Sequence, residues 1–236
     1  MERYKGKLFS LLGDSISTFD GCHPPECGVF YDWNHQREAG IYAPGDTWWG
    51  LVLEGLQAHL LVNHSWSGSL VCRQTQCEVE SYGCSDGRIA GLSVGQVQPD
   101  VVMIFMGLND FGWAMPPVAE QPGDLCVFSV AYDTMLEKLR ARCPAAEIWC
   151  FTLPRSTWRS QPDFAAPVIR GGWHLEQYCD VIRACARHWD CKLIDLAAAG
   201  VMYDTIDGLH PNREGMQTIA AAVLAEVEKE VAGYDH

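Results

Sequence analysis

Near the start of the chain an apolar run at 7–12 stops at Gly13-Asp14-Ser15, and near the other end stands Asp207-Gly208-Leu209-His210-Pro211. A serine hydroxyl becomes a nucleophile when an imidazole accepts its proton and a carboxylate orients that imidazole. Ser15, His210 and Asp207 are therefore candidates for acyl transfer through a covalent intermediate. Both stretches also suit ordinary turns, the second an Asx-type turn ahead of a helix, so neither decides the chemistry alone.

Two further residues suit the negative oxygen that develops in acyl transfer. Gly68 lets its backbone N–H approach a substrate with no side chain in the way. The Asn109 side chain supplies a neutral donor, and the backbone N–H of Ser15 would be a third. Each such donor is typically worth about 3–4 kcal/mol in the transition state.

These residues need elements that end beside them. Continuous apolar runs predict strands covered on both faces at 7–12, 59–65, 100–106, 146–152 and 191–196. Helical spacing predicts helices at 46–58, about 85–95, 124–142, 172–189 and 211–232. The alternation predicts an α/β fold, a three-layer α/β/α sandwich around a parallel sheet of about five strands. Functional residues of such sheets collect at the carboxyl ends of the strands, where all the candidates fall.

The pattern runs from end to end without a repeat or a low-complexity linker, so residues 1–236 are predicted to form a single domain. The segment 19–45 is the exception, because it is long and rich in Pro, Gly and aromatic residues. It is predicted to be a loop excursion, either functional or a packed surface segment.

Together, Gly13-Asp14-Ser15, Gly68, Gly107-Leu108-Asn109-Asp110 and Asp207-Gly208-Leu209-His210-Pro211 resemble the sequence blocks of the SGNH hydrolases, also called GDSL esterases and lipases. The blocks stand in the family's order over residues 13–211. The resemblance implies a flavodoxin-like sheet, a triad of Ser15, Asp207 and His210, and an oxyanion hole of Ser15, Gly68 and Asn109. It implies no metal and no other cofactor. The block around Ser15, Gly13-Asp14-Ser15-Ile16-Ser17, is not a Gly-x-Ser-x-Gly motif, so the ordinary α/β-hydrolase elbow does not apply to it.

Such a family member would be a serine esterase that hydrolyses carboxylic esters through an acyl-enzyme on Ser15. The family includes carbohydrate deacetylases, lysophospholipases, thioesterases and aryl esterases. No long apolar lid-like helix suggests a bulky lipid, so we expect a small-acyl (acetyl) esterase acting on acetylated carbohydrate. A lysophospholipase, thioesterase or acyltransferase with the same triad stays open, as does a non-catalytic ligand-binding module. The sequence lacks the Gly-rich phosphate loop of a nucleotide carrier.

Other residues are candidates for a substrate pocket. Tryptophan suits a sugar ring or an acyl group, and equally a core or an interface, while a histidine is more often structural. The candidates are Asp14, Trp48, His64, Trp66, Trp113, Trp173 and His174. Asp14 and Asp110 are expected to make structural hydrogen bonds. In the segment 153–171, the side chains of Arg155, Arg159 and Arg170 either bind an anionic group or face water.

Composition narrows the partners. The net charge of −13, without a basic stripe, disfavours nucleic acid, and no apolar stretch approaches the roughly 20 residues of a membrane helix. The N-terminal apolar run is too short for a secretion signal, which predicts a cytoplasmic protein with reduced thiols. The expected partner is a small-molecule ester, and tryptophans in 19–49 favour a homo-oligomer.

The eleven cysteines fall into two groups. The loop-like pairs are Cys22/Cys27 and Cys72/Cys77, with Cys84 nearby; their four-residue gaps do not match a zinc knuckle, so no metal is predicted and their pairing stays open. The others are predicted to be small core residues: Cys126, Cys143, Cys150, Cys179, Cys185 and Cys191.

Overall fold

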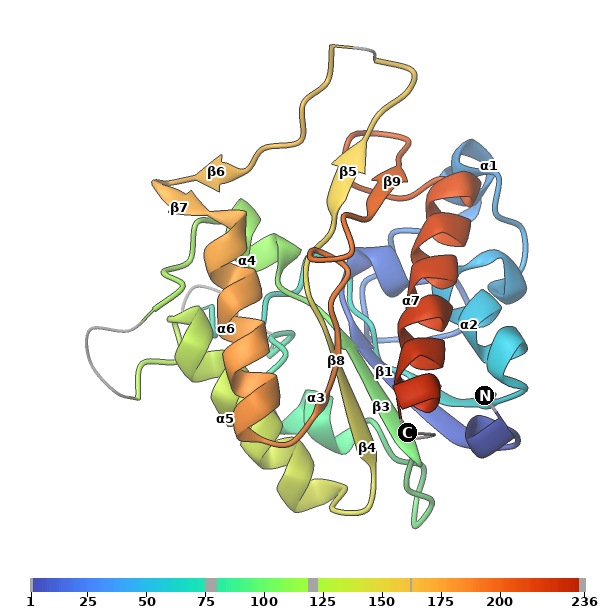
Figure 1. Cartoon of the computed structure of the whole chain (residues 1–236), viewed down its shortest axis with the longest axis vertical. Coiled ribbons are helices and arrows are strands. Elements are labelled where there is room, and N and C mark those ends of the chain that lie inside the picture. Colours follow the sequence, from blue (N-terminus) through green and yellow to red (C-terminus); the bar gives the residue numbers. More distant parts are fainter. Residues whose placement is uncertain (1, 75–79, 119–122, 162, 234–236) are drawn as a thin grey trace.

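A five-stranded parallel sheet forms the centre of the molecule (Figure 1). The structure is a computed structural model that describes residues 2–74, 80–118, 123–161 and 163–233. The strand order is β2-β1-β3-β4-β8. The strands are β1 (Leu8–Gly13), β2 (His59–Asn63), β3 (Val101–Phe105), β4 (Glu147–Phe151) and β8 (Lys192–Ile194). The predicted parallel sheet is confirmed; β1 is shifted by one residue from its predicted run, and the other four strands are shorter than theirs.

Helices cover both faces of this sheet, which confirms the three-layer α/β/α fold (Figure 1). On one face lie α3 (Asp86–Ala90), α5 (Phe128–Arg142) and α6 (Leu175–His188). On the other lie α2 (Trp48–Leu56) and α7 (Arg213–Gly233). The remaining helices are α1 (Trp33–Ala39), α4 (Leu108–Gly112) and the 3-10 turns η1 (Glu2–Tyr4), η2 (Ser15–Ser17) and η3 (Pro44–Asp46).

The central strand β3 shows why its sequence is continuously apolar. Val102 and Ile104 pack into the core under α5 and α6, whereas Val101, Met103 and Phe105 pack into the core under α2 and α7. Successive side chains of a strand point to opposite faces, so a strand buried on both faces needs apolar residues at every position. The same packing holds the strand ends in place for the loops that follow them.

Two predictions of the sequence are wrong in their limits. The segment 19–45 contains the helix α1, which begins after Asp32 because its carboxylate accepts hydrogen bonds from the amides of Asn34 and His35. It ends at Gly40, whose φ of +71° is the left-handed conformation typical of a helix C-terminus. The helix predicted at 85–95 covers only Asp86–Ala90, followed by a turn at Gly91.

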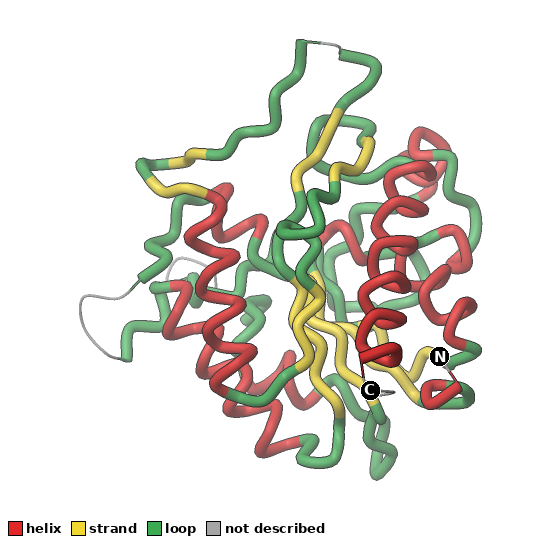
Figure 2. The backbone as a smooth tube through the Cα atoms, in the orientation of Figure 1, coloured by secondary structure: helices red, strands yellow, loops and turns green. Residues whose placement is uncertain are grey.

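Beyond the carboxyl ends of the sheet, the chain forms an additional layer (Figure 2). Strand β5 (Arg155–Thr157) pairs with β9 (Met202–Asp204), and β6 (Ile169–Arg170) forms a short hairpin with β7 (Trp173–His174). Between β5 and β6 runs a long loop, which we call the arch (residues 158–161 and 163–168). The arch therefore lies on the side where the sequence places the candidate site.

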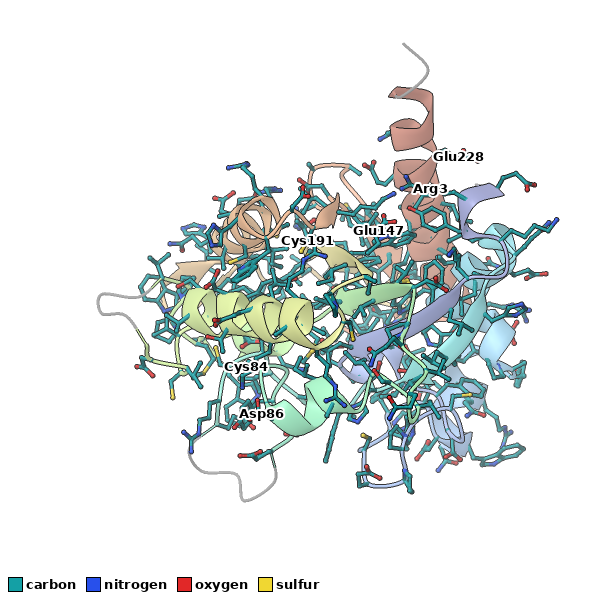
Figure 3. All side chains as sticks on the ribbon, turned by 90° about the horizontal axis from the view of Figure 1, so that it is seen from below. Arg3, Cys84, Asp86, Glu147, Cys191 and Glu228 are labelled. Carbon is teal, nitrogen blue, oxygen red and sulfur yellow. The ribbon has the colours of Figure 1, made fainter. Side chains whose placement is uncertain are left out.

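The N-terminal turn η1 lies at the opposite end of the sheet, where β4 begins. In Figure 3, seen from below, Arg3 and Glu147 lie beside one another, and Arg3 Nη2 is 3.4 Å from Glu147 Oε1. The Tyr4 hydroxyl donates to the same carboxylate at 2.9 Å. None of the helices among the described residues combines the length and hydropathy needed to cross a bilayer.

Candidate active site

Ser15 lies where β1 turns into η2. Asp14 caps this turn, because its Oδ1 accepts the Ile16 amide at 3.0 Å. The bend is tight: a Cβ on Gly13 would lie 2.5 Å from Ser65 Oγ and 2.7 Å from Ser17 Cβ, so only glycine fits there. Ser15 is the first residue of η2, so its amide belongs to the orphan donors at a helix start.

His210 and Asp207 stand beside this serine. His210 Nε2 is 2.9 Å from Ser15 Oγ, and His210 Nδ1 is 2.6 Å from Asp207 Oδ2. Asp207 Oδ1 also accepts the amides of Leu209 and His210 at 2.9 and 2.8 Å. Burial opposes ionisation of Asp207, but the hydrogen bonds from His210 outweigh it and lower the pKa of the carboxyl to about 2. A carboxylate, an imidazole and a hydroxyl thus form one hydrogen-bonded line.

The two other donor candidates, Gly68 and Asn109, each have an N–H that is available to a ligand. The Gly68 amide has no hydrogen-bond acceptor among the described residues, and its φ of +77° is one that glycine adopts freely. Asn109 donates through Nδ2 to Ser69 O at 3.0 Å, which leaves the second N–H of the amide for a ligand. Asp110 is buried and accepts the amides of Val71 and Cys72, both at 2.9 Å. The expected structural role of Asp110 is confirmed.

Arg88 is a residue that sequence reasoning missed. Its side chain is 1% exposed, and Nη2 donates to Gly13 O at 2.9 Å and to His64 O at 2.8 Å. Arg88 thereby joins the end of β1 to the end of β2, directly before the turns that carry Ser15 and Gly68. Burial lowers the pKa of Arg88 to about 10, so the guanidinium stays charged at neutral pH. An arginine in a short helix is expected to be exposed, so no signal in the sequence indicated that Arg88 is buried.

Phe30 is the second residue that was missed. Its ring stacks on the imidazole of His210, with centroids 3.4 Å apart and planes at 12°. Its other face stacks on His35 at 4.3 Å. The Phe30 amide donates to Thr18 Oγ1, and that hydroxyl donates to Ser15 O, so the 19–45 segment is tied back to the serine turn. The sequence showed that the 19–45 segment is long and rich in aromatic residues, but this signal did not distinguish Phe30 from the others.

Phe30→Ala is expected to lower kcat with little change in KM, because the stacked ring keeps His210 in line with Ser15 and shields it from water. An aromatic contact of about 0.5–1.5 kcal/mol corresponds to a roughly 2- to 12-fold loss. Steady-state kinetics on a nitrophenyl ester measures it, with Phe30→Leu expected to lie between. Trp33→Ala is the matched control, since Trp33 lies nearby in the chain and is 68% exposed. An equal loss in the control would remove the special role of Phe30.

The pocket candidates separate in the structure. The prediction that Trp48 lines a substrate pocket is wrong, because this residue is fully buried and its Nε1 donates to Ser17 Oγ. Asp14 is also wrong as a pocket residue: it is 2% exposed, and burial raises its pKa to about 7. His64 is 6% exposed beside Gly91, and burial lowers its pKa to about 4, so it is a neutral structural histidine.

The other candidate tryptophans and His174 lie in different parts of the structure. Trp66 is half-buried, with its indole against Gly28 and under the guanidinium of Arg88. Trp173 is half-buried and packs on the core of the α5 and α6 face. Trp113, 70% exposed, lines a cavity of about 340 Å³ that Asn109 and Asp207 also line. His174 lines an adjacent cavity of about 340 Å³. Trp113 is thus the pocket candidate that shares a cavity with predicted site residues.

The cysteines are free thiols in the described part of the chain. Cys22 and Cys27 do not pair, and burial raises the pKa of the Cys27 thiol to about 11. The pairing of Cys72 with Cys77 is not tested, because Cys77 lies outside the described residues. No group of three His, Cys, Asp or Glu side chains within the described ranges could hold a metal ion. The prediction that Cys126 is a core residue is wrong, because it is half-buried outside the core, whereas the half-buried Cys191 packs against the core of the α5 and α6 face.

Comparison with known proteins identifies the family. A model of the GDSL-like lipase/acylhydrolase family matches residues 7–155, which include Ser15, Gly68 and Asn109. No curated protein matches the chain. Several solved structures share the fold along nearly its whole length.

A protein classed as a GDSL-like lipase from Bacteroides ovatus is 23% identical, with a TM-score of 0.72 over 95% of this chain and 99% of that one. A second, from Bacteroides uniformis, is 27% identical, with a TM-score of 0.68 over 95% and 96%. A carbohydrate acetylesterase family member from Sinorhizobium meliloti is 19% identical, with a TM-score of 0.59 over 94% and 98%. The chain belongs to the GDSL-like lipase/acylhydrolase family and is a serine ester hydrolase.

Proposed function

We propose that this enzyme hydrolyses acetyl and other small-acyl esters through an acyl-enzyme on Ser15, with His210 as general base and Asp207 as its orienting carboxylate. The observation that carries the proposal is the line of two contacts, 2.9 Å from Ser15 Oγ to His210 Nε2 and 2.6 Å from His210 Nδ1 to Asp207 Oδ2. Both distances suit proton transfer along a hydrogen bond.

The reaction has two halves. Ser15 Oγ attacks the ester carbonyl while His210 Nε2 takes its proton; the tetrahedral intermediate then collapses, and His210 returns the proton to the departing alcohol. A water molecule, deprotonated by the same nitrogen, attacks the acyl-enzyme and releases the carboxylic acid and free Ser15. Asp207 holds Nδ1–H throughout and stabilises the imidazolium, since its low pKa keeps it ionised at neutral pH.

The oxyanion formed in both halves needs donors that are in place before reaction. The Ser15 amide, the Gly68 amide and the second N–H of Asn109 are the groups proposed for this role. Their positions are held by neighbouring contacts: Arg88 on Gly13 O, Asn109 on Ser69 O and Asp110 on the amides of Val71 and Cys72. Preorganised donors of this kind lower the barrier because they need no rearrangement as charge develops.

Acetylated carbohydrate is the proposed substrate class. The cavity next to Asn109 measures about 340 Å³, at the small end of ligand sites, and includes the exposed indole of Trp113 as a flat apolar surface. The Sinorhizobium meliloti neighbour, described as a carbohydrate acetylesterase family member, is consistent with this class, although a likeness at 19% identity carries the fold alone.

The test is a series of 4-nitrophenyl acetate, butyrate and octanoate, together with acetate release from peracetylated xylose. We expect kcat/KM to fall from acetate to octanoate, and a fluorophosphonate to label Ser15 as shown by peptide mass spectrometry. A preference for octanoate would contradict the small-acyl assignment while leaving the serine mechanism intact. Absence of both turnover and labelling would contradict the proposed function itself.

A further inference from the structure

Three arginines frame the arch, and the structure separates them. Arg159 is paired: its Nη1 contacts Glu214, and its Nε is 3.9 Å from Asp204 Oδ2. Arg155, at the start of β5, and Arg170, at the end of β6, have no side-chain partner within the described residues. Both Arg155 and Arg170 line the cavity that Asn109 and Asp207 line, and Arg159 does not.

Three other polar side chains of this cavity, those of Ser156, Tyr203 and Asp207, are already engaged. Ser156 donates to Gly208 O at 2.7 Å, and Tyr203 donates to Leu209 O at 3.0 Å. Asp207 is held by His210 and by two backbone amides. Most of the remaining wall is apolar and includes Trp113 and Phe164. Among the described residues, the two guanidinium groups are therefore the side-chain cations of this wall that have no anionic partner, on a protein whose net charge is −13.

The arch packs closely against the segments on either side of this cavity. The ring of Phe164 packs so closely on Gly208 that a Cβ on this glycine would lie 2.8 Å from the ring. The arch therefore packs on the turn between Asp207 and His210. A Cβ on Gly171, next to Arg170, would collide with Ala114 beyond the end of α4, so the returning end of the arch is also closely packed. Arg155 also borders the neighbouring cavity of His174, which places it at the junction of the two.

We propose that Arg155 and Arg170 bind an anionic group on the alcohol part of the ester, so that the preferred substrates are small-acyl esters of a negatively charged alcohol. This inference rests on the proposed function, because a small acyl group leaves the cavity to the alcohol. Guanidinium groups bind carboxylates, phosphates and sulfates through paired, charge-assisted hydrogen bonds. These groups have in common the negative charge that the proposal requires on the alcohol part of the ester.

The experiment compares two chromogenic acetates that differ by one charge, 4-nitrophenyl acetate and 3-carboxy-4-nitrophenyl acetate, each normalised to its rate with hydroxide. We expect wild type to prefer the carboxylated ester, and Arg155→Gln/Arg170→Gln to lower that preference roughly tenfold. The preference should also shrink between 20 mM and 500 mM salt, because screening weakens exposed charge pairs. Arg159→Gln, which removes the same charge from a paired arginine, is expected to keep the wild-type preference.

A second arm places the charge on the acyl part, with 4-nitrophenyl pentanoate and the 4-nitrophenyl monoester of glutaric acid. A preference that appears only in this arm would overturn the assignment to the alcohol part. An unchanged preference in the double variant, or an equal change in Arg159→Gln, would overturn the role of the two arginines.

Binding gives a readout that does not depend on turnover. In Ser15→Ala, the affinity for 3-carboxy-4-nitrophenyl acetate, measured by calorimetry, should fall roughly tenfold when Arg155 and Arg170 are also replaced. Failure of the proposed function would abolish turnover of every ester and leave this difference in place. Equal affinities in the two backgrounds would overturn the anion site alone.

Discussion

Ser15→Ala is expected to lower kcat for 4-nitrophenyl acetate by about 10⁴- to 10⁶-fold, the range seen when a serine nucleophile is removed from such a triad. The reason is that alanine leaves no oxygen to attack the carbonyl, while the remaining donors still bind the ester. KM should change far less than kcat. The side chain of Ser15 is small and almost fully buried, so the variant is expected to fold and to keep a thermal unfolding temperature close to that of wild type.

Two measurements make this result interpretable. Pre-steady-state kinetics of wild type should show a burst of nitrophenol if deacylation is slower than acylation, and the variant should show none. Ser160→Ala is the control, because Ser160 is an exposed serine of the arch. Retention of more than a few per cent of wild-type kcat by Ser15→Ala would mean that another group is the nucleophile.

Asp207→Asn is expected to have the second largest effect, a loss of about 10²- to 10⁴-fold in kcat. Asp207 Oδ2 accepts the proton on His210 Nδ1, whereas an asparagine with its Nδ2 at that position would donate and force the proton to Nε2. His210 in that tautomer cannot accept the proton of Ser15. The Oδ1 contacts to the amides of Leu209 and His210 can be kept by the asparagine oxygen, so the turn should survive.

The pH dependence of the thermal unfolding temperature distinguishes the loss of activity in Asp207→Asn from a loss of the fold. The pKa of Asp207 is lowered to about 2, so its ionised form stabilises the native state above the unfolded carboxyl's pKa, and this contribution is lost as the pH falls through about 2. Asp207→Asn should therefore unfold at a slightly lower temperature than wild type at pH 7, with the difference narrowing toward pH 3. Asp86→Asn, an exposed carboxylate, is the control. Wild-type kcat in Asp207→Asn would exclude Asp207 from the triad.

Much of the fold follows from local sequence. The five continuous apolar runs became the five parallel strands, because burial on both faces requires apolar side chains at each position. The contact of Asp207 with His210 was also within reach of the sequence, since only Gly208 and Leu209 stand between them. The helix α1 could have been found from Asp32 and Gly40, which are ordinary start and stop signals.

The tertiary structure decided which side chains meet across the sheet. His210 and Ser15 are 195 positions apart, and Phe30 reaches His210 only because its segment folds back through Thr18. Neither contact leaves a periodic pattern, because each depends on where two loops end in space. Trp48 and Trp113 make the same point: residue type allowed a pocket role for both, but packing buried the first and left the second at the cavity.

The arginines of the arch show the physical reason most directly. Sequence alone placed Arg155, Arg159 and Arg170 in one segment with the same charge. Glu214 of α7 and Asp204 of β9 then neutralise Arg159, while Arg155 and Arg170 are left facing a cavity. The sequence by itself determined the strands, the serine turn and the short Asp207–His210 motif, all of which depend on neighbours in the chain. Which charges are paired and which are free depends on distant elements, and only the folded chain decides it.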